Sequence, residues 1–269
     1  MPSPIDIDAY FARIQWCGSV RVDYATLAGL LRAHMRRIPF ENLDVLLGRP
    51  IRLDPDGLQD KLVRAGRGGY CFEHASLFAG VLETLGFAPV RHSARVVLTA
   101  PRTASPRTHM FLTVPLPEGM FVVDPGFGGL APDFPLPIAA HPQDAPADAT
   151  HWLVRGGAYW TLRAHRDGEV VDCWVSTLEA DNAVDFVVAN HYVSTHPDST
   201  FVNRLMLCAL TDDGRVSAMN RDVTLHAPEG AKRFALPDRR ALRTLLAEYF
   251  GFELPEVASL RVPSIEEWR

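Results

Sequence analysis

The chain has 269 residues, 47% of them hydrophobic, and a formal net charge of −5. This is enough for a sizeable core, and the length favours one large domain or two to three small ones. Without a basic surplus we expect no nucleic-acid partner, and without eighteen consecutive apolar residues we expect no membrane span. The first twenty residues contain no uninterrupted apolar stretch, so no signal peptide is predicted. The four cysteines are not closely paired, which favours a cytoplasmic protein with reduced thiols.

Helical patterns dominate the first ninety residues. In "DYATLAGLLRAHMRRIPF", Asp23 is a candidate N-cap and Pro39 a stop signal. One face of this helix carries Leu27, Leu30, Leu31, His34 and Ile38. In "LDPDGLQDKLV", Asp54 is the predicted cap of a second helix. A third helix is predicted to begin at Cys71 and to end near Gly86.

From residue 91 onward the pattern changes to short runs rich in β-branched and aromatic residues. Strands are predicted at 94–100, 108–116 and 120–127, with an irregular, proline-rich crossing at 131–150. A hairpin is predicted over 158–179 around Asp167-Gly168, and another over 201–226 around Asp213-Gly214. A final helix is predicted over 238–250. Helices followed by strands and a mixed C-terminal unit indicate an α+β fold.

Cys71 lies at the predicted start of a helix, directly after "RGGY". A free cysteine is usually a small buried hydrophobe, and we expect Cys17, Cys173 and Cys208 to be packing residues of this kind. A helix N-terminus carries a partial positive charge that favours a thiolate, which is the nucleophilic form of cysteine. Cys71 is therefore the candidate nucleophile.

A nucleophilic cysteine needs a histidine base, and that histidine needs an orienting carboxylate or amide. His109 lies at the start of the predicted strand 108–116, and Asp124 ends the strand "MFVVD". Strand ends beside loops are places where side chains from different segments can converge. Spacing alone leaves open whether the three residues meet, because a lone aspartate at a strand end is more often a turn former.

The chain resembles the arylamine N-acetyltransferase family over most of its length. The motifs "IPFENLDVLLGRPI", "RGGYCFE", "ARVV", "THMFLTV", "DPGFGG" and "HPDSTFV" occur in the order and spacing of that family. The resemblance places a catalytic triad, similar to that of papain-like thiol enzymes, on Cys71, His109 and Asp124. It also implies a helical bundle at 1–90, a β-barrel-like domain at 91–190 and an α/β lid at 191–269.

The resemblance implies a ping-pong reaction. Cys71 would take the acetyl group from acetyl-coenzyme A (acetyl-CoA), and an arylamine or hydrazine would then remove it, as in xenobiotic metabolism. His109 would transfer protons, and Asp124 would fix the tautomer of His109 and stabilise its charged form. Backbone N–H groups are expected to stabilise the oxyanion, although no particular groups are indicated. The oligomeric state is not indicated.

The glycines of "DPGFGG", Gly126, Gly128 and Gly129, are candidate contacts for the acyl group and pantetheine arm of coenzyme A (CoA). Phe40 and Phe127 are candidate walls of the amine pocket. No phosphate-binding motif is present, so CoA is expected to be held by scattered contacts, and no metal is expected.

Two positions depart from the family pattern. Pro125 replaces the usual valine after Asp124, and its ring is expected to stiffen that loop. His74 replaces an asparagine after Cys-Phe-Glu. We expect His74 to lie on the helix surface or behind the site, because His109 is the better partner for Cys71.

Three other functions are compatible with parts of this pattern. A macrolactam-forming amide synthase of the same fold would use the same triad. A thiol amidohydrolase would use water in place of the amine. A zinc-binding module could use Cys71, His109 and Asp124, but the long gaps between them and the lack of a Cys-x-x-Cys pair disfavour it. We therefore expect an acetyltransferase.

Overall fold

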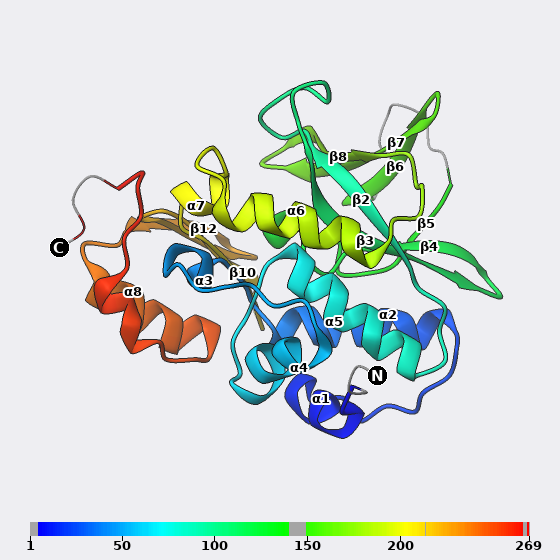
Figure 1. Ribbon diagram of the computed structural model, residues 1–269, viewed down its shortest axis with the longest axis horizontal. Helices are drawn as coiled ribbons and strands as arrows, with labels where there is room; N and C mark the ends of the chain where they lie inside the picture. The colour runs from blue at the N-terminus through cyan, green and yellow to red at the C-terminus, as the bar shows by residue number, and fades with distance from the viewer. Residues whose placement is uncertain (1–4, 140–148, 213, 266–267, 269) are drawn as a thin grey trace.

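The computed structural model describes residues 5–139, 149–212, 214–265 and 268. These residues form an α+β fold in which helices lie beside two antiparallel sheets (Figure 1). Within the described residues, no helix is both long enough and apolar enough to span a membrane.

The N-terminal part is helical, as predicted. Its elements are α1 (Ile7–Ile14), α2 (Tyr24–Arg37), α3 (Leu43–Leu46), α4 (Pro55–Leu58), a π-helical turn η1 (Gln59–Arg64) and α5 (Cys71–Thr84). The predicted caps of α2 and α4 are confirmed. The Asp23 carboxylate accepts a 2.8 Å hydrogen bond from the Thr26 amide, and the Asp54 carboxylate accepts one of 3.1 Å from the Gly57 amide.

The larger sheet has seven strands in the order β5-β4-β3-β2-β8-β7-β6. The strands are β2 (Val90–Val96), β3 (Arg107–Leu116), β4 (Gly119–Val123), β5 (Leu136–Pro137), β6 (His151–Gly156), β7 (Tyr159–Arg166) and β8 (Glu169–Ser176). The edge strands β5 and β6 contact each other, so the sheet is nearly closed into a barrel. Its interior is a core of apolar side chains that includes Phe111, Leu162 and Trp174.

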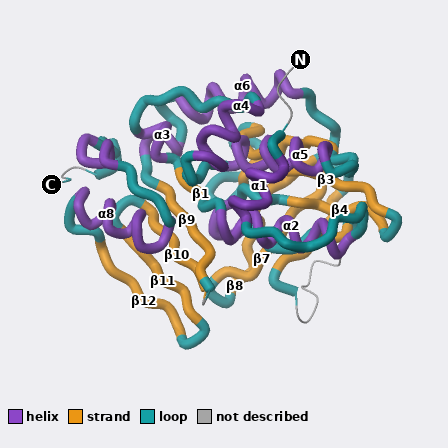
Figure 2. Tube along the Cα trace, turned by 90° about the horizontal axis from the view of Figure 1, so that it is seen from below, coloured by secondary structure: helices purple, strands orange, loops and turns teal. Residues whose placement is uncertain are grey.

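The second sheet has five strands in the order β1-β9-β10-β11-β12. They are β1 (Phe40–Glu41), β9 (Met206–Thr211), β10 (Gly214–Met219), β11 (Asp222–Ala227) and β12 (Gly230–Ala235). One face packs against α8 (Arg239–Leu245), η3 (Leu246–Phe250) and η4 (Pro255–Ser259), as the core residues shared between them show. Strand β1 comes from the N-terminal part and pairs with β9 (Figure 2), so two distant chain segments share this sheet.

The structure confirms one of the predicted hairpins and corrects the bounds of other predicted elements. The hairpin around Asp167-Gly168 is confirmed, with both residues at positive φ. The strand predicted from residue 201 begins at Met206, because Ser199 caps a short helix α7 (Thr200–Asn203). The single strand predicted over 215–226 is two strands, β10 and β11, joined by a turn at Asn220. The crossing at 131–150 contains β5, while its residues 140–148, like Asp213 of the predicted turn, lie outside the described residues.

Helix α6 (Ala183–Thr195) was not predicted. Its buried residues Phe186 and Val193 belong to the core formed by the N-terminal helices, and α6 contacts β3 of the barrel-like sheet. The boundary expected between residues 190 and 191 falls within α6. The three domain ranges stay a prediction.

Candidate active site

Cys71 is the first residue of α5, and the turn around it is fixed on both sides. The Glu73 carboxylate accepts a 3.0 Å hydrogen bond from the amide of Tyr70, which closes the helix start. The Tyr70 hydroxyl donates to the side chain of Asn190 on α6, whose amide donates in turn to the carbonyl of Ile51 at 3.1 Å. The thiol of Cys71 is buried and contacts the carbonyl oxygen of Thr108 at 3.8 Å.

His109 and Asp124 meet because β3 and β4 are neighbours in the sheet. Nε2 of His109 lies 2.8 Å from Oδ2 of Asp124, and both side chains are buried. Burial lowers the pKa of His109, but the charge and hydrogen bond of Asp124, together with a hydrogen bond and charge from Cys71, raise it to about 10. With Nε2 bound to Asp124, Nδ1 is the ring nitrogen left for the thiol. The structure therefore brings the three predicted residues together.

Asp124 is held by two more donors, one of which sequence reasoning missed. The indole N–H of Trp174 donates to Oδ2 of Asp124 at 2.9 Å, and the amide of Gly126 donates to Oδ1 at 3.3 Å. Trp174 stacks on Phe111, with ring centroids 4.3 Å apart. Its only sequence signal was a tryptophan in a predicted strand, which usually indicates core packing. Three donors keep the Asp124 carboxylate satisfied without water.

The glycine loop after Asp124 lies directly against the nucleophile. A Cβ atom at Gly126 would lie 2.6 Å from the Cα atom of Cys71, so only glycine fits there. Gly128 has a φ of +62°, which also favours glycine. Gly129 lies on the other side of the loop, where its carbonyl accepts a hydrogen bond from Arg215 of β10. Pro125 has no backbone N–H, but this removes no hydrogen bond to Asp124, because the amide that donates to Asp124 is that of Gly126.

The two predicted pocket residues border this loop. Phe127 meets His109 edge-on, with centroids 4.9 Å apart. Phe40 lies 3.5 Å from the position that a Cβ atom of Gly128 would occupy, and it also contacts Phe201. Both phenylalanines are only partly buried. Phe127 belongs to the loop and Phe40 packs against it, which leaves apolar ring surface near the triad.

His74 does not lie on the helix surface, so that part of the prediction is wrong. It is buried in a chain of hydrogen bonds in which Tyr10 Oη contacts Nδ1 of His34 at 2.8 Å and Nε2 of His34 contacts Nδ1 of His74 at 2.9 Å. Nε2 of His74 then lies 3.2 Å from the carbonyl oxygen of Pro39. Since a carbonyl oxygen only accepts, His74 donates from Nε2, His34 donates to His74, and Tyr10 donates to His34.

A buried cluster of charges lies behind the start of α5, and the sequence analysis did not identify it. Its members are Glu41, Asp44, Lys61, Arg67 and Glu73. Arg67 lies within ion-pair distance of Glu41 at 2.6 Å and of Asp44 at 3.3 Å, and Lys61 reaches Asp44 at 2.9 Å and Glu73 at 2.7 Å. Burial is the largest effect on the pKa of Glu73 and raises it to about 6, although Lys61 opposes the shift. The cluster joins β1 to the segment that carries Cys71.

The other cysteines are separate from this site. Cys173 and Cys208 are buried, as expected of packing residues, and burial raises the pKa of Cys173 to about 12 and that of Cys208 to about 11. Cys17 is exposed, so the expectation that it packs is wrong. In the described part of the chain, no group of three or more His, Cys, Asp or Glu side chains is arranged to hold a metal ion.

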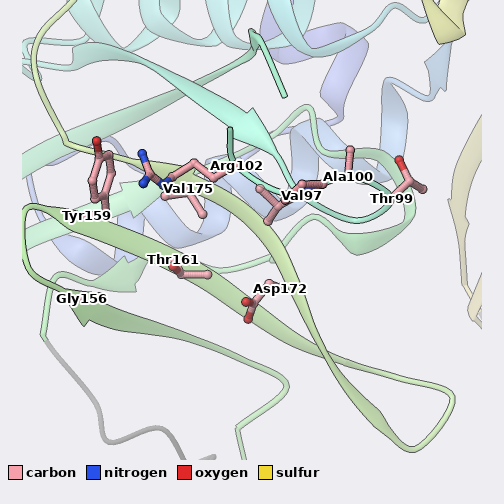
Figure 3. Close-up of a pocket in the computed structure, with 10 residues that line it drawn as sticks. Val97, Thr99, Ala100, Arg102, Gly156, Tyr159, Thr161, Asp172 and Val175 are labelled. Atoms are coloured by element: carbon pink, nitrogen blue, oxygen red, sulfur yellow. The ribbon is translucent and has the colours of Figure 1, made fainter. Parts of the chain in front are cut away.

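A cavity of about 640 Å³ lies on the outer side of the barrel-like sheet and does not include the triad. Tyr159, Thr161 and Val175 line it from β7 and β8, and Arg102 also lines it, with its guanidinium packed over the ring of Tyr159 (Figure 3). Neighbouring residues of a strand point to opposite faces. Val175 therefore faces away from Trp174, the contact of Asp124, and the cavity is not the acyl site.

Comparison with known proteins decides the family. A sequence model described as N-acetyltransferase matches residues 23–259. The arylamine N-acetyltransferase of Mycobacterium tuberculosis is 38% identical over 267 residues, covering 94% of this chain and 91% of that protein. The chain belongs to the arylamine N-acetyltransferase family. It is accordingly an acyltransferase enzyme.

Solved structures of the arylamine N-acetyltransferase family have the same fold. A variant of the Mycobacterium smegmatis enzyme has a TM-score of 0.89 and 35% identity, covering 97% of this chain and 100% of its own. The Mycobacterium marinum enzyme in complex with CoA has a TM-score of 0.87 and 35% identity, covering 94% of each chain. A member of this arylamine N-acetyltransferase family thus binds CoA on the same backbone.

Proposed function

We propose that the protein transfers an acetyl group from acetyl-CoA to the nitrogen of an arylamine or hydrazine through an acetyl-Cys71 intermediate. The observation that carries the proposal is the contact of a buried thiol with a histidine whose other ring nitrogen binds a buried carboxylate. This order of thiol, imidazole and carboxylate is similar to that of papain-like thiol enzymes.

In the first half-reaction, His109 holds the proton of Cys71, and the resulting thiolate attacks the thioester carbonyl of acetyl-CoA. The raised pKa of His109 supports the charged imidazolium that this step requires. The new carbon–sulfur bond forms while negative charge develops on the carbonyl oxygen. The amide N–H of Cys71, at the first position of α5, is the donor we assign to that oxygen, because such amides have no partner within the helix. Collapse breaks the bond to the CoA sulfur, which takes the proton from His109.

In the second half-reaction, the amine nitrogen attacks the acetyl carbonyl on Cys71. His109, now neutral, accepts the proton that the amine loses as its bond to carbon forms. Collapse then breaks the carbon–sulfur bond and releases the N-acetyl product and the Cys71 thiolate. Asp124 keeps Nδ1 of His109 directed at the sulfur and stabilises the imidazolium in both half-reactions.

The aromatic amine is assigned to the apolar surface beside the glycine loop. Phe127 meets His109 edge-on, so a ring that packs on Phe127 would bring its amino group close to the base. Phe40 lies across Gly128 from that position. The close approach of Gly126 to Cys71 leaves the backbone, and no side chain, beside the acyl group.

The proposal is tested by mass spectrometry of the intact protein after mixing with acetyl-CoA in the absence of amine. We expect one acetyl group, located on the peptide that contains Cys71, and its removal on addition of an arylamine. Cys17→Ser is the matched control, because Cys17 is the exposed cysteine and its variant should acetylate as the wild type does. Acetylation of Cys71→Ser to the same extent, or an acetyl group that the amine does not remove, would overturn the proposal.

A further inference from the structure

The hydrogen-bond chain of Tyr10, His34 and His74 takes no part in the proposed reaction, although it lies next to the site. Its three side chains are each at most 1% exposed and come from three different helices, α1, α2 and α5. His74 lies on α5 one helical turn after Cys71. Apolar side chains at these positions would need no partners, whereas buried polar groups are costly unless they are hydrogen-bonded. A fully satisfied buried network fixes the arrangement of the segments that it joins.

The chain ends at the carbonyl of Pro39, the residue directly before Phe40. His74 donates from Nε2 to this oxygen over 3.2 Å. The Gly69 amide donates to the same oxygen at 3.2 Å, and the Glu41 amide donates to the carbonyl of Gly69 at 2.8 Å. These two backbone bonds lie on either side of Phe40 and pair it in parallel with Gly69. The histidine chain thus acts on the backbone that carries one wall of the proposed amine pocket.

The two segments that meet at this carbonyl are in direct contact. A Cβ atom at Gly68 would collide with the carbonyl oxygen of Pro39, so only glycine fits there. The glycine segment runs on to Cys71 at the start of α5. Phe40 and Cys71 are therefore held against each other through their backbones. His74 is a side chain of α5 that reaches the same carbonyl from the helix itself.

The Phe40 ring depends on this backbone for its position. It belongs to β1, which has only two residues and pairs with β9 over that short length. The ring is partly buried, with the ring of Phe201 at a centroid distance of 6.2 Å on one side and Gly128 on the other. A hydrogen bond to the carbonyl directly before Phe40 therefore helps to set where the ring lies relative to the glycine loop.

We propose that His74 is a positioning residue for the aromatic amine, because its hydrogen bond to the Pro39 carbonyl fixes where the Phe40 ring lies. The bonds from Tyr10 to His34 and from His34 to His74 hold His74 in the tautomer that carries its proton on Nε2. The inference rests on the proposed function, which supplies the amine. It assigns His74 to the selection of the amine and not to proton transfer, since the partner of Nε2 is a backbone carbonyl.

The test uses two amide substitutions of His74 that differ in reach. The amide of His74→Gln extends to the place of Nε2 and can donate to the Pro39 carbonyl, but it loses the acceptor for His34. The amide of His74→Asn is one methylene shorter, so it can accept from His34 at the place of Nδ1 but does not reach Pro39. Each variant loses one bond of the chain, so His74→Gln is the matched control for a general loss of stability.

The activity assay compares aniline, which has a ring to pack on Phe40, with hydrazine, which has none. In a ping-pong reaction, kcat/KM for the amine depends on the second half-reaction alone. His74→Asn should lower the ratio of kcat/KM for aniline to that for hydrazine about tenfold, as expected for the loss of one well-placed aromatic contact. His74→Gln should keep the ratio of the wild type. In all three proteins kcat/KM for acetyl-CoA should be equal, because Glu73 and Asn190 hold the turn before Cys71.

A double variant tests whether His74 acts through the Phe40 ring. Phe40→Ala alone should lower the ratio of aniline to hydrazine. Adding His74→Asn to Phe40→Ala should lower it no further, because both changes remove the same contact. A further fall of about tenfold in the double variant would overturn the inference.

Three other results would overturn the positioning role. One is an unchanged ratio in His74→Asn, and another is an equal slowing of aniline and hydrazine by that variant, which would place the defect at the triad. A lowered ratio in His74→Gln would also overturn it, whether or not His74→Asn folds. A wild-type protein that acetylates hydrazine but not aniline would overturn the positioning role alone. A wild-type protein that acetylates neither would overturn the proposed function, and the positioning role with it.

Discussion

Asp124 accepts hydrogen bonds from His109, Trp174 and Gly126 and is fully buried. Asp124→Asn preserves the size of this side chain but removes the charge that raises the pKa of His109. The amide would also favour the wrong tautomer of the imidazole. By analogy with other triads we expect kcat to fall by about 10⁴-fold. Steady-state turnover of acetyl-CoA and arylamine measures this, with thermal unfolding as the check on folding. Turnover near that of the wild type would rule out Asp124 as the orienting group.

Trp174 allows a finer test of the same carboxylate. Trp174→Phe keeps an aromatic ring on Phe111 but removes the N–H that donates to Asp124. We expect about a tenfold loss of kcat/KM, since one hydrogen bond to a charged group is lost. Trp152→Phe is the matched control, because Trp152 is equally buried and its N–H has no partner in the described residues. If both variants lose the same activity, the effect comes from packing and not from the hydrogen bond.

At the residue scale, the sequence predicted the parts of the site that have a distinctive motif. Cys71, His109 and Asp124 were found because nucleophile, base and orienting carboxylate follow known chemistry and a specific family pattern. Trp174 was not, because nothing in a strand sequence distinguishes a tryptophan that donates to a carboxylate from one that only packs. Gly126 lies directly against the backbone of Cys71. This contact depends on tertiary structure, so the spacing of the two residues in the sequence does not predict it.

At the scale of elements, α6 shows where sequence patterns mislead. Its outward face carries Val184, Val187 and Val188, which are 57–67% exposed. With apolar residues on both faces the helix has no clear amphipathic period, and its valines favour a strand. The one local signal was a capping pair, in which the Asp185 carboxylate accepts a 2.8 Å hydrogen bond from the Asn182 amide.

The buried pair of His34 and His74 at the contact between α2 and α5 should make the free energy of unfolding depend on pH. Burial lowers the pKa of His34 well below its usual value and lowers that of His74 to about 4. In the unfolded chain both titrate near 6.5. Between these values the unfolded chain binds more protons at these two histidines, so their contribution to the free energy of unfolding should fall as the pH falls from about 6.5 to 4, while the raised pKa of Glu73 acts in the opposite direction. The limiting slope is about 1.4 kcal/mol per pH unit for each histidine.

Urea unfolding at pH 6.0, 5.5 and 5.0 measures this slope. His109 does not contribute to it, because its folded pKa is raised to about 10 and its stabilising effect is fully present below pH 6.5, being lost only at higher pH. His74→Asn should reduce the slope, whereas the control His191→Asn, at an exposed position of α6, should leave it unchanged. A slope that is the same in all three proteins would contradict the buried, neutral state of His74.

At the scale of the whole molecule, the α+β class and the barrel-like sheet were predictable, but the way the parts are joined was not. Strand β1 has only two residues, yet it connects the N-terminal helices to the C-terminal sheet. A strand this short has no detectable alternation in the sequence. Glu41 and Asp44 of "ENLD" and Arg67 of "GRGG" meet behind it. Charged residues are usually exposed unless they are paired, and the sequence does not show which of them will pair.

Arg67 contacts both the N-terminal part of the chain and the C-terminal core. Its guanidinium binds Glu41 of β1 and Asp44 of α3, and it lies 5.1 Å from the ring centre of Phe252 in the C-terminal core. Arg67→Met would leave Glu41, which is fully buried, without its cation. Breaking a buried pair from one side typically costs about 3–5 kcal/mol, a large share of a typical stability of about 5–15 kcal/mol.

The free energy of unfolding in urea should therefore fall by about 3–5 kcal/mol in Arg67→Met. Arg67→Met combined with Glu41→Met should recover part of that loss, because no buried charge is then left without a partner. Arg64→Met is the matched control. Arg64 pairs with Asp60 on the exposed surface, with side chains 52% and 60% exposed, and such pairs contribute about 1 kcal/mol or less. If the double variant is less stable than Arg67→Met alone, the cost lies in lost packing against Phe252 and not in the unpaired carboxylate of Glu41.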